Sequence, residues 1–115
     1  MENIRIPKGV RVYLSGPISG YDPDERKDYF CEMQRKLILR GLEAVNPFEN
    51  GLSDWRPRTE HMTADLKMLL GCYAILMLDG WQKSAGACLE LMVAYQCGIK
   101  VIMGYDNIIL DEEPF

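Results

Sequence analysis

The sequence VRVYLSGPISGYDPDE, at residues 10–25, contains the beginning of the fold. Its first part, residues 10–14, is rich in residues that favour a short β-strand. Residues 15–20 are dense in turn-forming residues, so the strand is predicted to end in a glycine-bearing loop. Asp22 then offers a helix N-cap, and Pro23 suits the first helical position. The stretch therefore predicts a strand, a loop and the start of a helix.

The rest of the chain continues this alternation of helices and strands. The predicted elements are a helix at residues 23–40, a strand at 42–46, a helix at 59–70, a strand at 73–78, a helix at 85–97 and a strand at 99–103. Helical spacing predicts the buried stripes of the first two helices: Phe30, Met33, Leu37 and Ile38, then Met62, Leu66, Leu69 and Leu70. Thr59 is expected to cap the second of these helices. The strand at 73–78 is apolar without alternation, as expected of a central parallel strand.

This order of elements is typical of a doubly wound α/β domain with right-handed crossovers. The expected sheet is flavodoxin-like and parallel, with four to five strands in the order 2-1-3-4 and helices on both faces. In that order the winding reverses between strands 1 and 3, and ligands bind outside the carboxyl ends of the strands there. The loops at this switch point are residues 15–20 and 79–86, so connectivity alone predicts a ligand site between them.

Length and composition exclude several classes of protein. The 115 residues suit one domain, residues 1–115, because a chain of this size buries roughly 65% of its unfolded surface. A formal net charge of −4 provides no basic field for a nucleic acid polymer. The longest mostly apolar run, residues 68–78, is about half of the ~20 residues that a membrane span needs. Since the amino terminus lacks a secretory signal and the cysteines form no CxxC pair, we expect a cytoplasmic protein with reduced core thiols.

Glu90 is the most informative candidate for catalysis. It is the only charged residue in the predicted helix at 85–97, where helical spacing places it on one face with the small residues Gly86 and Ala87. It lies near the amino end of that helix, where the dipole should favour the ionised carboxylate that a nucleophile requires. The alternative is a solvent-facing glutamate on a half-exposed helix.

The other candidates also have structural alternatives. Gly16 and Gly20 could let a ligand approach the backbone, or could serve only a strand-to-helix turn. Asp65 could lie on a solvated helix face, and Asp79 could be a turn residue. Trp81 could stack on a base or merely cover the end of the sheet.

The chain has one histidine, His61, which is expected on the surface in the first turn of a helix. A single histidine excludes a two-histidine metal site and argues against a serine triad. We therefore expect neither a metal nor an organic cofactor.

Three blocks of the sequence together resemble the nucleoside 2-deoxyribosyltransferase superfamily, in particular its small members from phages and bacteria. The blocks are VYLSGPISG at residues 12–20, MTADL and LLGC within residues 62–72, and DGWQKSAGACLEL at residues 79–91. They follow one another in the family's order and spacing over most of the chain. The resemblance implies cleavage or transfer at the N-glycosidic bond of a (deoxy)nucleoside or its 5′-monophosphate.

The resemblance also implies roles for individual residues. Glu90 matches the family's glutamate, which attacks the anomeric carbon and forms a covalent glycosyl-enzyme. Asp65 matches an aspartate that assists the departing base. The sugar then passes to a second base or to water. The matching substrate-binding positions are Tyr13, Gly16, Ser19, Gly20, Asp79, Trp81, Ser84 and Gly86.

Two departures from the family pattern bear on the substrate. Ser84 stands where the transferases have an aspartate, and where related nucleoside 5′-monophosphate N-glycosidases have a serine that helps to hold the phosphate. Its place at a helix start suits an anion. Ser19 replaces the arginine of those hydrolases, so the expected counter-charge is missing. The alternative function is a catalytically silent module that binds or sequesters a nucleotide.

Proteins similar to this one form homodimers or larger homo-oligomers, in which a neighbouring subunit helps to close the site. The apolar residues 108–110 and Phe115 could form such a contact, or could fold back on the chain's own core. We therefore expect a homo-oligomer whose ligand is a small nucleoside or nucleotide.

Overall fold

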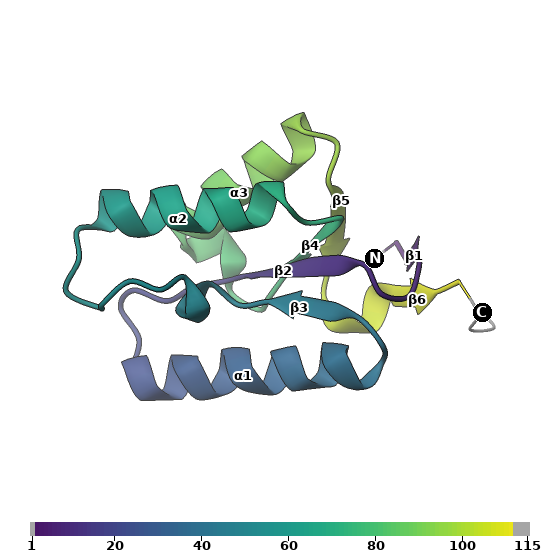
Figure 1. Ribbon diagram of the computed structural model, residues 1–115, viewed down its shortest axis with the longest axis horizontal. Helices are drawn as coiled ribbons and strands as arrows, with labels where there is room; N and C mark the ends of the chain where they lie inside the picture. The colour runs from purple at the N-terminus through teal and green to yellow at the C-terminus, as the bar shows by residue number, and fades with distance from the viewer. Residues whose placement is uncertain (1, 112–115) are drawn as a thin grey trace.

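The computed structural model describes residues 2–111 and has a main parallel sheet with helices on both faces (Figure 1). Its strands, in the spatial order β3-β2-β4-β5, are β2 (Arg11–Ser15), β3 (Glu43–Val45), β4 (Ala74–Met77) and β5 (Lys100–Met103). The α-helices are α1 (Pro23–Leu39), α2 (Arg58–Leu70) and α3 (Ala85–Gln96). Helix α1 covers one face, and α2 and α3 cover the other. Counted along the chain from β2, these strands have the predicted order 2-1-3-4, so the doubly wound α/β fold is confirmed.

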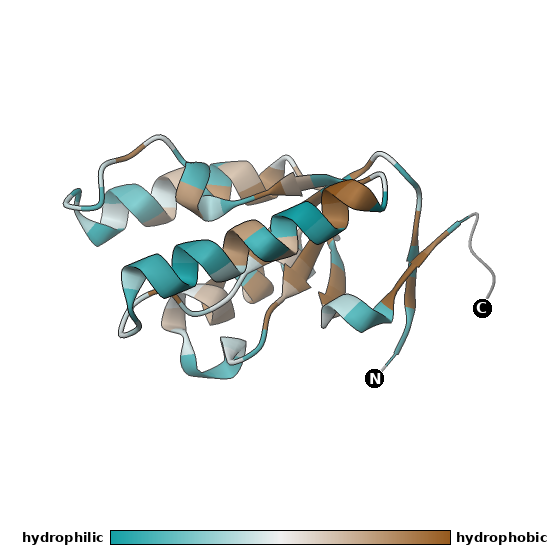
Figure 2. Ribbon diagram, turned by 90° about the horizontal axis from the view of Figure 1, so that it is seen from below, coloured by the Kyte–Doolittle hydropathy of each residue, from teal (hydrophilic) through white to brown (hydrophobic). Residues whose placement is uncertain are grey.

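The core has two halves, one on each face of the main sheet. Along β2, Val12 and Leu14 pack in the half that α1 covers, whereas Tyr13 packs in the half that α2 and α3 cover. Ser15 shares the face of Tyr13, because side chains alternate along a strand. Figure 2 shows the apolar strands inside the molecule and a hydrophilic outer surface on α1. The alternation thus directs Tyr13 and Ser15 towards the layer that contains α3.

The buried stripes of the first two helices are narrower than predicted. Leu37 and Leu69 are fully buried, but the residues after them, Ile38 and Leu70, are each 54% exposed. A one-residue step turns a helix by about 100°, which takes these two side chains away from the sheet. Their prediction as core residues was wrong.

The two predicted helix caps had different outcomes. Asp22 caps α1 as predicted, since its side chain accepts a hydrogen bond of 2.9 Å from the backbone N–H of Asp24. Thr59 does not cap α2, which begins one residue earlier with Pro57 at the N-cap position and no side-chain cap bond. The proline ring fixes φ of Pro57, and this residue leads from extended backbone into the first turn of α2 without a side-chain cap.

A second, two-stranded parallel sheet pairs β1 (Ile4–Ile6) with β6 (Ile108–Leu110), and neither strand was predicted. Such short strands contain too few residues to show a period. The first and last side chains of β6 are buried in the core beneath α1. Ile108 and Leu110 therefore fold back on the chain's own core, whereas Ile109 is half-buried and Phe115 lies outside the described residues.

Two further expectations concerned the cysteines and the membrane. The cysteines are free thiols, but only Cys72 is buried, while Cys31 and Cys97 are exposed. Cys31 lies on the exposed side of α1 and Cys97 caps the carboxyl end of α3, so the prediction of core thiols was wrong for these two. Within residues 2–111, no helix has the length and apolar character needed to cross a membrane.

Candidate functional site

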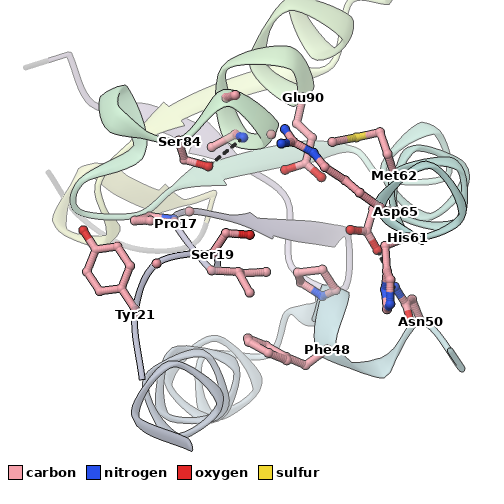
Figure 3. Close-up of a pocket in the computed structure, with 18 of the residues that line it drawn as sticks. Pro17, Ser19, Tyr21, Phe48, Asn50, His61, Met62, Asp65, Ser84 and Glu90 are labelled. Atoms are coloured by element: carbon pink, nitrogen blue, oxygen red, sulfur yellow. Dashed lines mark hydrogen bonds between the residues drawn. The ribbon is translucent and has the colours of Figure 1, made fainter. Parts of the chain in front are cut away.

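A cavity of about 650 Å³ opens at the carboxyl ends of β2 and β4. Its volume lies within the range of small-molecule sites. The walls come from the loop after β2, the loop between β3 and α2, the first half of α2 and the start of α3 (Figure 3). The cavity therefore lies at the switch point that connectivity predicted.

Most of the predicted site residues line this cavity: Gly16, Ser19, Gly20, Asp65, Ser84, Gly86 and Glu90. Tyr13, Asp79 and Trp81 do not. Tyr13 is fully buried and donates a hydrogen bond to Glu90, so it lies behind Glu90 and not at the cavity wall. Trp81 packs against the core beneath α2 and α3, and Asp79 is exposed in the turn before it. Trp81 and Asp79 thus lie as their structural alternatives describe, and Tyr13 reaches the cavity through Glu90. Their roles in substrate binding stay predictions.

Glu90 is held by two hydroxyl groups from β2. The Tyr13 hydroxyl donates a hydrogen bond of 2.6 Å to Oε2, and the Ser15 hydroxyl donates one of 2.7 Å to Oε1. Glu90 is only 6% exposed, yet it lines the cavity and points into it from α3 (Figure 3). Both carboxylate oxygens are therefore fixed from the sheet side, and a solvent-facing role for Glu90 is excluded.

The electrostatics of Glu90 differ from the prediction. Burial raises the pKa of Glu90 to about 7, and the charge of Asp65 also raises it, while the hydrogen bonds from Tyr13 and Ser15 lower it. The helix dipole was expected to favour the ionised carboxylate, but desolvation outweighs it. Burial also raises the pKa of Tyr13 above its usual 10, so this hydroxyl stays protonated and remains a donor. The Glu90 carboxyl therefore gains or loses its proton close to neutral pH and not near its usual 4.5.

Asp65 is the second carboxyl group of the cavity. It enters from α2, on the side of Glu90 opposite Ser84 (Figure 3). Burial raises the pKa of Asp65 above its usual 3.8, whereas a hydrogen bond from Asn50 and the charge of His61 lower it. Two carboxyl groups in one cavity, each with a raised pKa, can act as a nucleophile and a proton donor.

Ser84 forms the N-cap of α3. Its hydroxyl oxygen accepts a hydrogen bond of 3.1 Å from the backbone N–H of Ala87, drawn as a dashed line in Figure 3. The Ser84 hydroxyl can still donate its own hydrogen into the cavity. A Cβ added at Gly86 would lie 3.4 Å from Cε of Met62, so the small residue lets α2 and α3 approach at the cavity wall.

The two glycines of the loop after β2 have backbone roles as well as lining the cavity. A Cβ added at Gly16 would lie 3.0 Å from Cβ of Leu78, too close for the present packing of the loop on the end of β4. Gly20 has φ of +85°, a conformation that other residues rarely adopt. Both glycines thus shape the loop that carries Ser19.

Basic residues at the cavity were missed by the sequence analysis: Lys27, Arg56, Arg58 and Lys83. Lys27 and Arg56 form ion pairs with acidic neighbours. Arg58 and Lys83 are exposed, and neither has an ion-pair partner among residues 2–111. They come from two different elements, so no local motif could have indicated them. They add positive charge to the wall of the cavity.

His61 was expected on the surface, but it is half-buried and lines the cavity. Its ring contacts Asn50 and the backbone carbonyl of Ser53. Asn50 was also missed, since it lies in a long loop that shows no period. Among residues 2–111 no cluster of three or more histidine, cysteine or acidic side chains could hold a metal ion.

Comparisons with known proteins agree with this architecture. The family model described as "Domain of unknown function (DUF4406)" matches residues 10–103. A 2-deoxyribosyltransferase from Leishmania mexicana has a similar structure, with a TM-score of 0.64 and 17% identity over 92% of this chain. A conserved protein from Enterococcus faecalis V583 has a TM-score of 0.62 and 25% identity over 86% of this chain. No curated protein matches the sequence.

These similarities concern the fold. This chain spans 66% of the length of the Leishmania protein and 70% of the Enterococcus protein. The predicted nucleoside 2-deoxyribosyltransferase-like fold is confirmed by the first of these structures.

Proposed function

We propose that this chain, which belongs to the DUF4406 family, breaks the N-glycosidic bond of a nucleoside or its 5′-monophosphate through a glycosyl ester on Glu90. The observation that carries the proposal is the setting of the Glu90 carboxyl. It is nearly buried, both of its oxygens accept hydrogen bonds from β2, and it still opens into a cavity. The 2-deoxyribosyltransferase fold supports the same class of reaction.

In the first step, a carboxylate oxygen of Glu90 attacks the anomeric carbon and forms an ester bond. The carbon–nitrogen bond breaks, its electron pair leaves with the base, and Asp65 donates a proton to that base. Because the hydroxyls of Tyr13 and Ser15 already hold Glu90 in place, the nucleophile needs little reorganisation.

In the second step, water or another base attacks the same carbon, and the ester electrons return to Glu90. The Asp65 carboxylate takes the proton that the attacking group loses. Two displacements at one carbon retain its configuration. Hydrolysis and transfer differ only in the group that attacks the intermediate.

We further propose that the substrate carries a 5′-phosphate. Ser84 and the amino end of α3 lie on the side of Glu90 opposite Asp65 (Figure 3). Arg58 and Lys83, which have no ion-pair partner among residues 2–111, line the same cavity and add positive charge to it. A cavity of about 650 Å³ has room for a single nucleotide. The phosphate and the base would then bind on opposite sides of the attacked carbon.

We also propose that the protein is a homo-oligomer that uses the outer face of α3. Leu89, Met92 and Tyr95 on this helix are 39%, 64% and 75% exposed. Glu90, the only charged residue of α3, points inward, so the outer face is uncharged. A helix that is apolar on all sides is normally covered, and two copies of this face would cover each other.

The test is to incubate the purified protein with a panel of nucleosides and 5′-monophosphates and to measure free base by chromatography. We expect base release from at least one compound, and a loss of about 1,000-fold or more in Glu90→Gln. Glu32→Gln, at an exposed site on α1, is the matched control and should keep the wild-type rate. Binding measured by calorimetry without any release would contradict the proposal and favour the silent nucleotide-binding module.

A further inference from the structure

Asn50 contacts the Asp65 side chain inside the cavity. This residue lies in the loop between β3 and α2, just after the short 3-10 helix at Pro47–Glu49. Its Nδ2 donates a hydrogen bond of 2.8 Å to Oδ1 of Asp65, and both side chains line the cavity (Figure 3). The loop thus reaches the group that is proposed to protonate the leaving base.

The orientation of the Asn50 amide is determined by its other contacts. Its Oδ1 accepts a hydrogen bond of 3.0 Å from the backbone N–H of Leu52, so Nδ2 must face Asp65. Nδ2 also lies 3.1 Å from Nδ1 of His61, which accepts a hydrogen bond when the imidazole is neutral. The other ring nitrogen of His61 then donates to the carbonyl of Ser53 at 3.0 Å. A flipped amide would place its NH₂ group against the N–H of Leu52.

This contact makes the two oxygens of Asp65 unequal. Oδ1 accepts the N–H of Asn50, so a proton on the carboxyl group is expected on Oδ2. Every buried side-chain oxygen or nitrogen among residues 2–111 has a hydrogen-bond partner. Oδ2 of Asp65 has no partner among these residues, so it is not a buried atom. Because Asp65 lines the cavity, Oδ2 is accessible from the cavity.

We propose that Asn50 is a positioning residue for base departure, because its amide occupies Oδ1 of Asp65 and leaves the proton on Oδ2, beside the leaving base. This inference rests on the proposed function. As the carbon–nitrogen bond breaks, its electron pair stays on the base, and the proton moves from Oδ2 to the base. Asp65 becomes a carboxylate, and its hydrogen bond from Asn50 becomes charge-assisted and stronger. Asn50 thus stabilises the acid after it has lost its proton.

The test compares two substrates: one whose base must be protonated in order to leave, and one whose base leaves without a proton. An ordinary purine nucleoside, or its 5′-monophosphate, needs a proton at the base, whereas its N7-methylated form releases a neutral base without one. If the base released is a pyrimidine, the 4-nitrophenyl glycoside of the same sugar replaces the methylated compound. For Asn50→Ala we expect a loss in kcat/KM of about 10- to 100-fold on the ordinary substrate and less than about threefold on the activated one.

Two further variants keep the test decisive. Asn50→Leu has nearly the size of asparagine but no group that can donate to Asp65, so it should show the same selective loss even if Asn50→Ala fails to fold. In an Asp65→Asn background, Asn50→Ala should cause no additional loss, because the two residues act through one group. Gln82→Ala removes an exposed amide outside the cavity and should leave both substrates unaffected.

Equal losses on the two substrates would show that Asn50 only supports the structure, and would overturn this inference. An unchanged rate on the ordinary substrate would also overturn it. In either case an active wild-type protein leaves the proposed function intact. A wild-type protein that releases no base from either substrate overturns the proposed function and this inference with it.

Discussion

At the scale of single residues, the Glu90 carboxyl is subject to two opposing effects. A nucleophile must be ionised, but burial favours the neutral acid and raises the pKa of Glu90 to about 7. The hydroxyls of Tyr13 and Ser15 offset part of this effect, because each donates to one carboxylate oxygen. The site thus keeps a carboxylate that is poorly solvated and still partly ionised near neutral pH.

One consequence is that Glu90→Gln should stabilise the folded protein at alkaline pH. The pKa of this carboxyl is raised from 4.5 to about 7 by folding, so between these values the folded state binds more protons than the unfolded state. Wild-type stability therefore falls as pH rises through this window and is flat above it. The gain in the free energy of unfolding should be about 3 kcal/mol larger near pH 8 than near pH 4.5. Urea unfolding measures this, and a gain that does not depend on pH would contradict it.

A second consequence concerns Tyr13. In Tyr13→Phe, Glu90 loses one of the two hydrogen bonds that lower its pKa, so this pKa should rise above about 7. The pH at which kcat/KM reaches half its plateau should move upward by about one unit. Tyr73→Phe is the control, because Tyr73 is exposed, directly precedes β4 and does not line the cavity. A lower rate with an unchanged midpoint would show that Tyr13 does not tune Glu90.

At the scale of the elements, regular segments were predictable and loop contacts were not. The small residues beside Glu90 indicated that this face of α3 meets the sheet, and Ala87, Glu90 and Ala94 are the buried residues of the helix. Strand alternation placed residues 13 and 15 on one face, but the sequence does not tell which helix covers that face. Asn50 lies in a loop without periodicity, so its contact with Asp65 depends on the folded path of the chain. The contact between Tyr13 and Glu90 was therefore not predicted, and Asn50 was missed.

The start of α3 leads to a prediction about the phosphate. Ser84→Ala removes the cap bond to Ala87 and should lower the free energy of unfolding by about 1 kcal/mol. It should also reduce kcat/KM more for 5′-monophosphates than for nucleosides. Lys83→Gln and Arg58→Gln lose no ion pair within the described residues, so they test the charge without altering the cap.

For each of these two cation variants we expect about a tenfold loss on monophosphates and less than about a twofold loss on nucleosides, since a charge-assisted contact contributes roughly 1.5 kcal/mol. Lys67→Gln, on an exposed part of α2 outside the cavity, should change neither rate. Equal losses on both substrate classes would refute a phosphate site at this end of the cavity.

At the scale of the whole molecule, the cavity is assembled from three segments that are distant in the sequence, within residues 16–27, 47–65 and 83–90. The net charge of −4 gives no general attraction for a nucleotide, so selectivity must come from local groups at the cavity. The short strands β1 and β6 pair away from it, at the other end of the main sheet (Figure 1). The outer face of α3, with Leu89, Met92 and Tyr95 exposed, is the apolar surface to which the proposed contact between subunits is assigned.

The exposed face of α3 leads to a prediction about assembly. Light scattering at micromolar concentration should give the mass of a dimer or a larger homo-oligomer, and Met92→Lys should lower that mass because it places a charge in the contact. Leu39→Lys changes an equally apolar side chain, 75% exposed at the end of α1, and should leave the mass unchanged. A monomeric wild-type protein would contradict the proposed contact.

The central claim is that Glu90 becomes covalently attached to the sugar. The most direct measurement is mass spectrometry of protein quenched in acid during turnover of a nucleoside or its 5′-monophosphate, followed by proteolysis. The account predicts one added glycosyl group, on the peptide that contains Glu90, and no added mass in Glu90→Gln. Free base released at the wild-type rate by Glu90→Gln, or a glycosyl group attached elsewhere, would contradict it.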